Sequence, residues 1–534
     1  MKLFYGEHII TMDEQGNEVT AVLVEDGRIK QVGVVDDFKE WMNDSQVEKV
    51  NLENKTLLPG FIDPHSHISM MGPFSAMANL RNCESFNDVI DTLKTYIKEN
   101  ELEETDVVLG VGYDHNFLQE AAHPTKDVLN QVSTSHPIFI SHASGHVGCA
   151  NDATLKLVGI NASTRDAEGG RIGRIEGTNE PNGYVEENDM IGILEKLMPK
   201  LKFDFSELAL AGQDIYIENG ITTAQDGATS SDTLQLFSSF AEQNQLKLDV
   251  VAYPTIADNP EDMWKYEAYA KKYHHRLKIG GYKMFLDGSP QGKTAWMSEP
   301  YEGVESYRGY PRYTDDEVEK FARKAIDDDV QLLTHCNGDA ASEQLLNSYE
   351  AALEASDNPN KNNLRPVMIH CQTVRDDQLD RMVDIQMIPS IFNAHTYYWG
   401  DVHLKNLGIK RGNKISPAKT AFDKGLVVNF HQDAPVVAPD MLHSIWCAVN
   451  RITRSGVKIG EEECVSAYDA LKAVTINAAY AYFEEDEKGS IAEGKLADFV
   501  VLDRNPLEVE TMEIKDIQVV ETIKEGETVF KRES

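Results

Sequence analysis

The stretch Pro59-Gly60-Phe61-Ile62-Asp63-Pro64-His65-Ser66-His67 joins a short apolar segment to two histidines that are one residue apart. Side chains of an extended segment alternate in direction with a period of two, so His65 and His67 point the same way. Both imidazoles can then reach one cation, such as Zn²⁺ or Fe²⁺. A single His-x-His is a weak signal, because histidines on strands are more often structural. The ends of the other strands therefore decide the interpretation.

Short apolar segments alternate with amphipathic helical stretches through the middle of the chain. Eight segments read as strands: 60–63, 221–226, 248–253, 281–286, 330–335, 366–370, 387–392 and 426–430. This alternation is typical of parallel strands joined by helices. Eight such strands are what a closed barrel needs, so the sequence predicts an α/β fold, a (β/α)8 TIM barrel over 58–487.

Both ends of the chain are rich in predicted strands. Residues 20–33 form two apolar runs around Asp26-Gly27, which predicts a hairpin. Near the other end, 497–503, 517–523 and 528–530 read as strands. We expect 1–57 and 488–534 to pair as a small β-sandwich domain built from both chain ends.

One connection is much longer than the others. Between His67 and Ile221 lie 153 residues, far more than a strand-to-helix connection requires. This stretch has strands of its own at 106–111 and 137–141 and helical runs at 86–99 and 206–219. We therefore expect an inserted subdomain over 72–212, after the first barrel strand.

Charge and composition limit the partners. The 534 residues include 51 Lys and Arg and 88 Asp and Glu, a net charge of −37. Such a surface repels nucleic acid and anionic lipid, which leaves a small-molecule substrate as the expected partner. No apolar run is long enough for a membrane span or a signal peptide. The chain has only six cysteines and no Cys-x-x-Cys pair, so we expect no disulfide framework and a reducing cytoplasmic location. A homodimer is the expected assembly, because it is the commonest one.

Polar residues stand at the ends of several predicted strands. In a barrel the carboxyl ends of the strands meet on one face, where active sites lie. Besides the two histidines of the first strand, the residues at such positions are Lys283, His335, His370 and Asp433. Each could be a satisfied polar residue by itself, and Lys283 could form a salt bridge to Asp287. Together they predict a metal site.

These residues belong to longer motifs that resemble the amidohydrolase superfamily, most closely its N-substituted formamide deformylase-like subgroup (amidohydrolase family 3). The motifs are Leu58-Pro-Gly-Phe-Ile-Asp-Pro-His-Ser-His67, His142-Ala-Ser-Gly-His146, Gly220-Ile-Thr-Thr223, Lys283-Met-Phe-Leu-Asp-Gly-Ser289, His335-Cys-Asn-Gly-Asp-Ala340, Ile369-His-Cys-Gln372, Asp433-Ala-Pro435 and Gly489-Ser-Ile-Ala-Glu-Gly-Lys-Leu-Ala-Asp-Phe499. The resemblance spans nearly the whole chain.

The resemblance implies a binuclear centre of two divalent metal ions. His65, His67 and Asp433 would bind the first ion, His335 and His370 the second, and a carboxylated Lys283 would bridge them. Zinc is the expected metal, with Fe, Mn, Co and Ni as alternatives. Asp433 would act as general base and then general acid for a metal-activated hydroxide.

Further residues are candidates for binding the substrate. They are Tyr113, His142, His146, Asp287, Trp296 and His431. The resemblance favours His142 and His146 as lining of the active site over a third metal site. Asp287 either bonds within the site or caps structure, and His431-Gln432 stands where such proteins often have Gly-Ser.

The predicted activity is hydrolysis of a non-peptide C–N bond in an amide, formamide or cyclic amide. One alternative is a mononuclear aminohydrolase, similar to deaminases. Those pair the fifth-strand histidine with a helical His-x-x-Glu and need no lysine on the fourth strand, whereas here His335 precedes Cys-Asn-Gly-Asp and Lys283 is present. Lactone or ester hydrolysis is a second alternative. A scaffold without metals is disfavoured, because all six ligands are retained.

Overall fold

The computed structural model describes residues 1–13, 19–143, 145 and 147–533. The chain forms two compact units, one of Met1–Ser69 with Leu210–Ser534 and one of Met70–Ala209. In this described part, no helix is long and apolar enough to cross a membrane. All six cysteines are present as free thiols.

Two small sheets in the first unit are built from the ends of the chain. The first has the order β4 (Arg28–Gly33), β3 (Ala21–Glu25), β1 (Lys2–Tyr5), β5 (Glu48–Asn51), and the second β2 (His8–Ile9), β6 (Thr56–Pro59), β22 (Phe499–Leu502), β23 (Val519–Lys524), β24 (Glu527–Lys531). The predicted hairpin is confirmed, since β3 and β4 pair antiparallel. Asp26 and Gly27 both have positive φ, as a tight hairpin turn requires.

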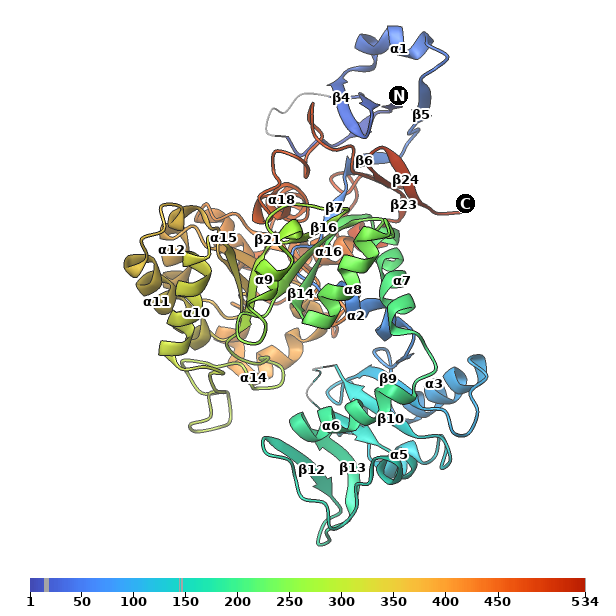
Figure 1. Ribbon diagram of the computed structural model, residues 1–534, viewed down its shortest axis with the longest axis vertical. Coiled ribbons are helices and arrows are strands. Elements are labelled where there is room, and N and C mark those ends of the chain that lie inside the picture. The colour runs from blue at the N-terminus through green and yellow to red at the C-terminus, as the bar shows by residue number, and fades with distance from the viewer. Residues whose placement is uncertain (14–18, 144, 146, 534) are drawn as a thin grey trace. The chain divides into compact units, whose positions relative to one another are not determined.

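The second sheet unites the two ends of the chain. Strand β6 pairs with β22 antiparallel, so blue and red segments lie side by side (Figure 1). Apolar side chains from both sheets share one core: Phe4 and Val22 come from the first sheet, and Phe499 and Ile523 from the second. The rings of Phe4 and Phe499 meet edge to face at 5.5 Å. Burial of these side chains against each other holds the two sheets together.

The middle of the first unit is built on parallel strands in two sheets. One sheet has the order β16 (Leu277–Ile279), β15 (Asp249–Pro254), β14 (Ile221–Thr229), β7 (Phe61–Ile62), and the other β17 (Gly281–Phe285), β18 (Gln331–Cys336), β19 (Val367–His370), β20 (Ile388–Ile391), β21 (Asn429–Phe430). A parallel bridge between Thr255 and Lys283 connects them. All eight predicted strands are present in the predicted order, and β16 is an additional one. The prediction of an α/β fold is thus confirmed. The strand hydrogen bonds define two parallel sheets.

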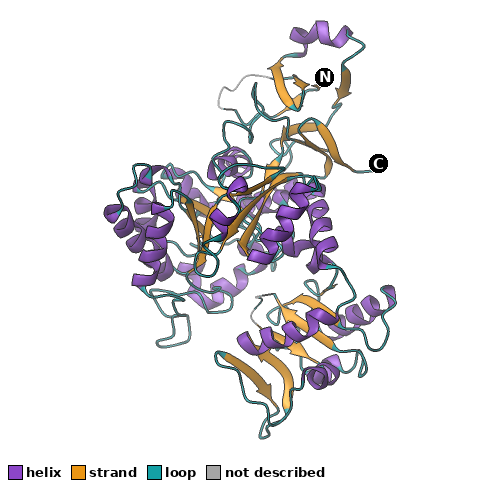
Figure 2. Ribbon diagram, in the orientation of Figure 1, coloured by secondary structure: helices purple, strands orange, loops and turns teal. Residues whose placement is uncertain are grey.

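Helices cover these parallel strands, and Figure 2 shows them in purple around the orange strands. The first unit contains α1 (Lys39–Asn43), α8 (Ser231–Glu242), α9 (Asp262–Lys265), α10 (Asp315–Asp327), α11 (Asp339–Ala355), α12 (Asp376–Asp384), α13 (His395–Tyr398), α14 (Gly400–Gly412), α15 (Ala418–Asp423), α16 (Met441–Asn450), α17 (Ala467–Ala473) and α18 (Ile476–Ala481). Helices α2 (Ile68–Ser75) and α7 (Phe205–Glu218) each contain a unit boundary.

The second unit is a six-stranded mixed sheet with helices. Its order is β12 (Gly170–Arg174), β13 (Pro181–Glu186), β11 (Val147–Ala150), β10 (Ile138–His142), β9 (Val108–Tyr113), β8 (Ala78–Asn79), with helices α3 (Phe86–Glu99), α4 (Lys126–Leu129), α5 (Asp152–Val158) and α6 (Glu187–Leu197). Alternate residues of β9 face opposite sides. Leu109 packs in one apolar cluster with Ile193, and Val108 in another with Leu93. Both faces of the sheet are therefore buried, which holds β9 and β10 firmly in place.

Candidate metal centre

Three predicted ligands meet just beyond the carboxyl end of β7. Nε2 of His65 and Nε2 of His67 lie 3.2 and 3.3 Å from the same atom, Oδ1 of Asp433. The side chain of His65 is 1% exposed and that of Asp433 14%. Donor atoms at 2.0–2.1 Å from a tetrahedral zinc ion are about 3.3 Å apart, so these spacings suit ligands of one cation.

The second nitrogen of each imidazole is held by a neighbouring oxygen on β14. Nδ1 of His65 lies 2.7 Å from Oε1 of Gln225, and Nδ1 of His67 lies 2.6 Å from the carbonyl oxygen of Gly227. Because a carbonyl oxygen only accepts, each Nδ1 carries the proton and donates it. Each Nε2 faces Asp433, and in the neutral ring it carries the lone pair that a cation would bind. Such outer partners fix the tautomer of metal-binding histidines.

Main-chain hydrogen bonds fix Asp433 beside the two histidines. The amide of Asp433 donates to the carbonyl oxygen of His65 at 3.2 Å, and the amide of His67 donates to that of Ala434 at 2.7 Å. Asp433 has a φ of 53°, an uncommon conformation for a residue other than glycine. Burial acts to raise the pKa of Asp433, but the two histidines outweigh it and hold the pKa well below 3.8. The carboxylate is therefore charged at neutral pH.

The other two predicted histidines form a second pair. Nδ1 of His335 and Nε2 of His370 are 2.9 Å apart, at the ends of β18 and β19. Nε2 of His335 lies 3.3 Å from the carbonyl oxygen of Gly288, which leaves Nδ1 to face His370. Ligand atoms of His65, His370 and Asp433 all lie within 4.8 Å of one another. The two histidine pairs thus share one site.

Lys283 on β17 is fully buried at this site. Its Nζ has no hydrogen-bond partner in the part of the chain that the structure describes, and it lies 5.0 Å from the centre of the Phe285 ring. Burial lowers the pKa of Lys283 to about 7, against an opposing effect of Asp433. The alternative of a salt bridge to Asp287 does not occur.

Asp287 instead binds the main chain of two loops. Its carboxylate accepts hydrogen bonds from the amides of Asn337 at 3.0 Å, Gly338 at 2.7 Å and Trp296 at 2.9 Å. Burial raises the pKa of Asp287 to about 7, against the effect of these amides. Oδ1 also lies 3.6 Å from Nε2 of His335. Asp287 therefore positions the loop that follows His335, and Trp296 enters this contact through its main chain.

His431, at the position that departs from the family pattern, is fully buried inside the histidine cluster. Its ring centre lies 5.0 Å from that of His65 and 5.1 Å from that of His370. Neither of its nitrogens has a hydrogen-bond partner among the described residues. Both nitrogens are thus available to a ligand of the site.

Sequence reasoning missed Gln225 and Gly227, which hold the two histidines of the first strand. A signal existed, because Gln225 lies near the carboxyl end of the predicted strand 221–226 and Gly227 follows that strand directly, positions like those that selected the predicted ligands. The glycine is also needed for space. A Cβ atom at position 227 would lie 2.9 Å from Cε1 of His65, which is closer than real contacts allow.

Tyr113 and His142 belong to the second unit, and His146 lies outside the described residues. The hydroxyl of Tyr113 lies 3.0 Å from Nδ1 of His123. His142 lies beside Asp114 and His115. Their prediction as substrate-binding residues stays a prediction.

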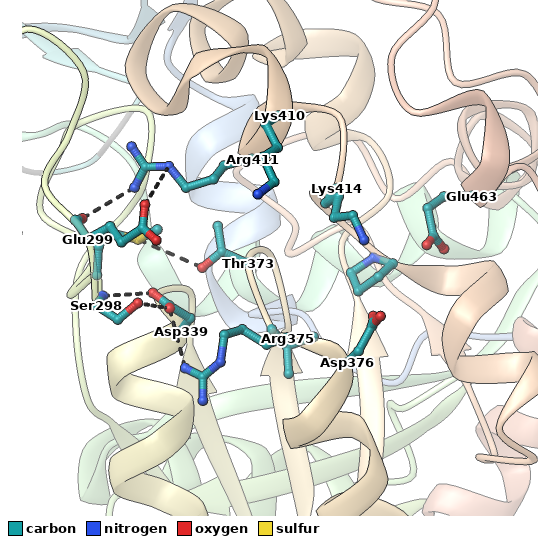
Figure 3. A pocket seen from close by; sticks show the side chains of 13 residues that line it. Ser298, Glu299, Asp339, Thr373, Arg375, Asp376, Lys410, Arg411, Lys414 and Glu463 are labelled. Carbon is teal, nitrogen blue, oxygen red and sulfur yellow. Dashed lines mark hydrogen bonds and ion pairs between the residues drawn. The ribbon is translucent and has the colours of Figure 1, made fainter.

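A cavity of about 270 Å³ follows the strand that ends at His370 (Figure 3). Its lining combines four cationic side chains with four carboxylates: Arg375, Lys410, Arg411 and Lys414, and Glu299, Asp339, Asp376 and Glu463. None of the candidate metal ligands is part of this lining, and the opposite charges balance. The cavity therefore favours no ligand of either charge.

Comparison with known proteins agrees with the class of protein that these residues define. The amidohydrolase family matches residues 48–530, and the chain belongs to this family. It is therefore a hydrolase that acts on carbon–nitrogen bonds. The predicted resemblance is confirmed.

Individual relatives match over their full length. YtcJ of Bacillus subtilis (strain 168), an amidohydrolase by name, is 27% identical and covers 99% of both chains. The N-substituted formamide deformylase of Arthrobacter pascens is 26% identical over 99% of this chain and 98% of its own. A solved structure of an uncharacterized metal-dependent hydrolase from Pyrococcus horikoshii is similar in fold, with a TM-score of 0.76 and 24% identity over 96% of this chain and 99% of its own.

Proposed function

We propose that the protein is a metal-dependent hydrolase that cleaves the C–N bond of a small amide, formamide or cyclic amide at a centre of two divalent cations. The observation that carries the proposal is that Oδ1 of Asp433 lies 3.2 Å from Nε2 of His65 and 3.3 Å from Nε2 of His67. The proton positions on both imidazoles leave these nitrogens free to bind. The relationship to an N-substituted formamide deformylase supports this substrate class.

Two ligand sets fit two cations. His65, His67 and Asp433 would hold the first, and His335 and His370 the second. The residues suit this role chemically, because imidazole nitrogens and a carboxylate oxygen are ligands that zinc accepts. Iron, manganese, cobalt and nickel are alternatives with the same ligands. Metals bound here would supply Lewis acidity and make water a nucleophile at neutral pH.

Lys283 would join the two sets as a carbamate. A buried ammonium group without a partner is costly, and the Nζ of Lys283 is such a group if it is protonated. The neutral amine attacks CO₂, a C–N bond forms and one proton leaves. The product has two oxygens that can bind two cations. Carboxylation thus turns an unpaired buried cation into a bridging ligand.

Asp433 would carry the proton during the reaction. Its carboxylate is charged at neutral pH, and it lies where both ligand sets meet. It would take a proton from the attacking water and deliver it to the departing nitrogen. His431, which is buried among the same histidines and has no hydrogen-bond partner in the described part of the chain, would contact the substrate.

The arrangement of the fold supports a site of this kind. We propose that the two parallel sheets close into a (β/α)8 TIM barrel over 58–487, because eight of their strands follow the barrel order and a bridge joins Thr255 to Lys283. The two terminal sheets would form a β-sandwich of 1–57 and 488–534. Trp296 would line the substrate pocket. A homodimer in the cytoplasm is the expected state.

A screen of metal-loaded protein tests the proposed function. The compounds are N-formyl amines, acyl amides, cyclic amides, aminated heterocycles and lactones, each assayed with wild-type protein and with the Lys283→Ala variant. We expect turnover of at least one amide or formamide by the wild type, and restoration of activity in the variant by added short carboxylic acids, which replace the missing oxygens. Turnover confined to lactones or to deamination would contradict the proposal.

A further inference from the structure

A second cluster of ligand-type residues lies in the second unit, formed by Asp114, His115 and His142. Nδ1 of His115 and Nε2 of His142 are 3.1 Å apart. Oδ1 of Asp114 lies 3.4 Å from Nε2 of His142 and 3.7 Å from Nδ1 of His115. Two nitrogens and one carboxylate oxygen thus form a nearly regular triangle.

We propose that Asp114, His115 and His142 bind a zinc ion. Tetrahedral zinc has ligand atoms at 2.0–2.2 Å, and two such atoms are about 3.3–3.5 Å apart. The three observed distances lie around this value. The triangle therefore has the dimensions of one face of a zinc tetrahedron. An octahedral site with 2.1 Å bonds needs about 3.0 Å, which fits less well.

The three ligands come from the carboxyl ends of two adjacent parallel strands. His142 is the last residue of β10, and it pairs with Tyr113, the last residue of β9, after a shift in register at Ser141. Asp114 and His115 follow β9 directly. The sheet beneath is buried on both faces, so the strand ends are rigid before a cation binds. A preformed site of this kind loses little conformational entropy on binding.

The surroundings of the three side chains suit the binding of a cation. The side chains of Asp114 and His142 are only 3% and 6% exposed, whereas that of His115 is 33% exposed and leaves a path for the ion. The main-chain amide of Asn116 donates to Asp114 at 2.9 Å, which orients the carboxylate. The His123 ring stacks on His115 at 4.1 Å and packs against its side chain.

A comparable group on the first unit lacks these features. Glu242, His274 and His275 also lie within ligand distance of one another. The side chains of Glu242 and His274 are 60% and 43% exposed, and such exposed groups are common without a metal. This group serves as the matched control. The geometry thus favours a metal site at His142 over the substrate-lining role that the sequence suggests. The proposed zinc site does not depend on the proposed function of the first unit.

The test compares the zinc content of full-length variants after chelation and equilibrium dialysis against zinc alone. The His115→Ala/His142→Ala variant removes two ligands, and His274→Ala/His275→Ala removes two histidines from the control group. We expect the first variant to bind about one zinc ion fewer than the wild type and the second to bind as many as the wild type. An equal zinc content in the first variant and the wild type would overturn the proposal.

Hydrogen exchange of the wild type provides a second measurement that needs no variant. Some amides of β9 and β10 exchange only when this site opens. Zinc at about one hundred times its Kd should slow the exchange of these amides about 100-fold. The same addition should leave those amides unchanged in the His115→Ala/His142→Ala variant. Exchange in β9 and β10 of the wild type that does not respond to zinc would contradict a site at these strand ends.

Discussion

Nδ1 of His65 lies 2.7 Å from Oε1 of Gln225. The amide nitrogen of the same glutamine donates to the carbonyl oxygen of Pro64 at 2.6 Å and to the hydroxyl of Tyr482 at 3.1 Å. These two bonds determine which end of the glutamine faces His65, so the oxygen accepts the imidazole proton. Gln225 thereby sets the tautomer of a proposed metal ligand from outside the ligand set.

Replacement of Gln225 by alanine should weaken metal binding without removing a ligand. His65 would lose its acceptor and its fixed orientation, and losses of this kind reduce metal affinity about 10–100-fold. Competition with a chelating indicator measures the affinity. The control is Gln235→Ala, on the exposed face of α8, which should bind metal like the wild type. Equal affinity of both variants would exclude the positioning role of Gln225.

Alanine at Gly227 should disturb the same histidine by crowding. The new Cβ atom would lie 2.9 Å from Cε1 of His65, and overpacking of this kind costs about 1–3 kcal/mol. We expect a lower free energy of unfolding in urea and weaker metal binding. In Gly192→Ala the new Cβ meets nothing within 4 Å, and this helical position should gain about 0.5–1 kcal/mol. A neutral effect at position 227 would show that the ring of His65 can move freely.

Asp433→Asn should separate metal binding from turnover. The amide oxygen can still face both histidines, but it takes up no proton at neutral pH. We expect the metal content to stay close to that of the wild type and kcat to fall by about 10²–10⁴-fold, the usual contribution of general acid–base catalysis. Both quantities are measured on the same preparation. A metal-loaded variant with wild-type kcat would remove the proton-transfer role from Asp433.

A buried ion cluster should govern stability in acid. Oδ2 of Asp249, on β15, lies 2.5 Å from Nζ of Lys488 and 2.9 Å from Nζ of Lys524. Burial acts to raise the pKa of Asp249, but the two ammonium groups outweigh it and hold the pKa below 3.8. A carboxyl whose pKa is lower in the folded state stabilises the fold fully above its unfolded pKa. That contribution is lost as the pH falls through the folded pKa.

Asp249→Asn should therefore cost stability at neutral pH and little in strong acid. We expect a loss of about 3 kcal/mol in the free energy of unfolding at pH 7, since a buried pair is broken. The difference from the wild type should stay constant above about pH 5 and shrink below it. Asp214→Asn, which breaks an exposed pair with Lys247, should cost less than about 1 kcal/mol. A difference at position 249 that grows in acid would reverse the assigned sign.

The sequence predicts the parallel strands of the first unit well, because most of them are short apolar runs between helical patterns. Strand β16 was missed, since Leu277-Lys278-Ile279 is short and has a charged residue at its centre. Lys278 is nevertheless buried, where it contacts Glu484. That partner is 206 residues away in the chain, and a local pattern does not contain it.

The predicted metal ligands of the first unit do come together, because one rule, that carboxyl ends of parallel strands share a face, placed them. What the sequence does not provide is the second contact of each side chain. The tautomer of His67 depends on the carbonyl oxygen of Gly227, and the unpaired state of Lys283 depends on Asp287 binding three main-chain amides instead. These are properties of loop conformations, which follow from the assembled fold and not from spacing.

Anomalous X-ray diffraction from crystals of metal-loaded protein tests most directly whether two cations are joined through Lys283. We predict two anomalous peaks within the cluster, one beside His65 and His67 and one beside His335 and His370. Electron density for a carboxylated Lys283 should lie between them. One peak or none at this cluster, with an unmodified Lys283 that turns away from the histidines, would contradict the account.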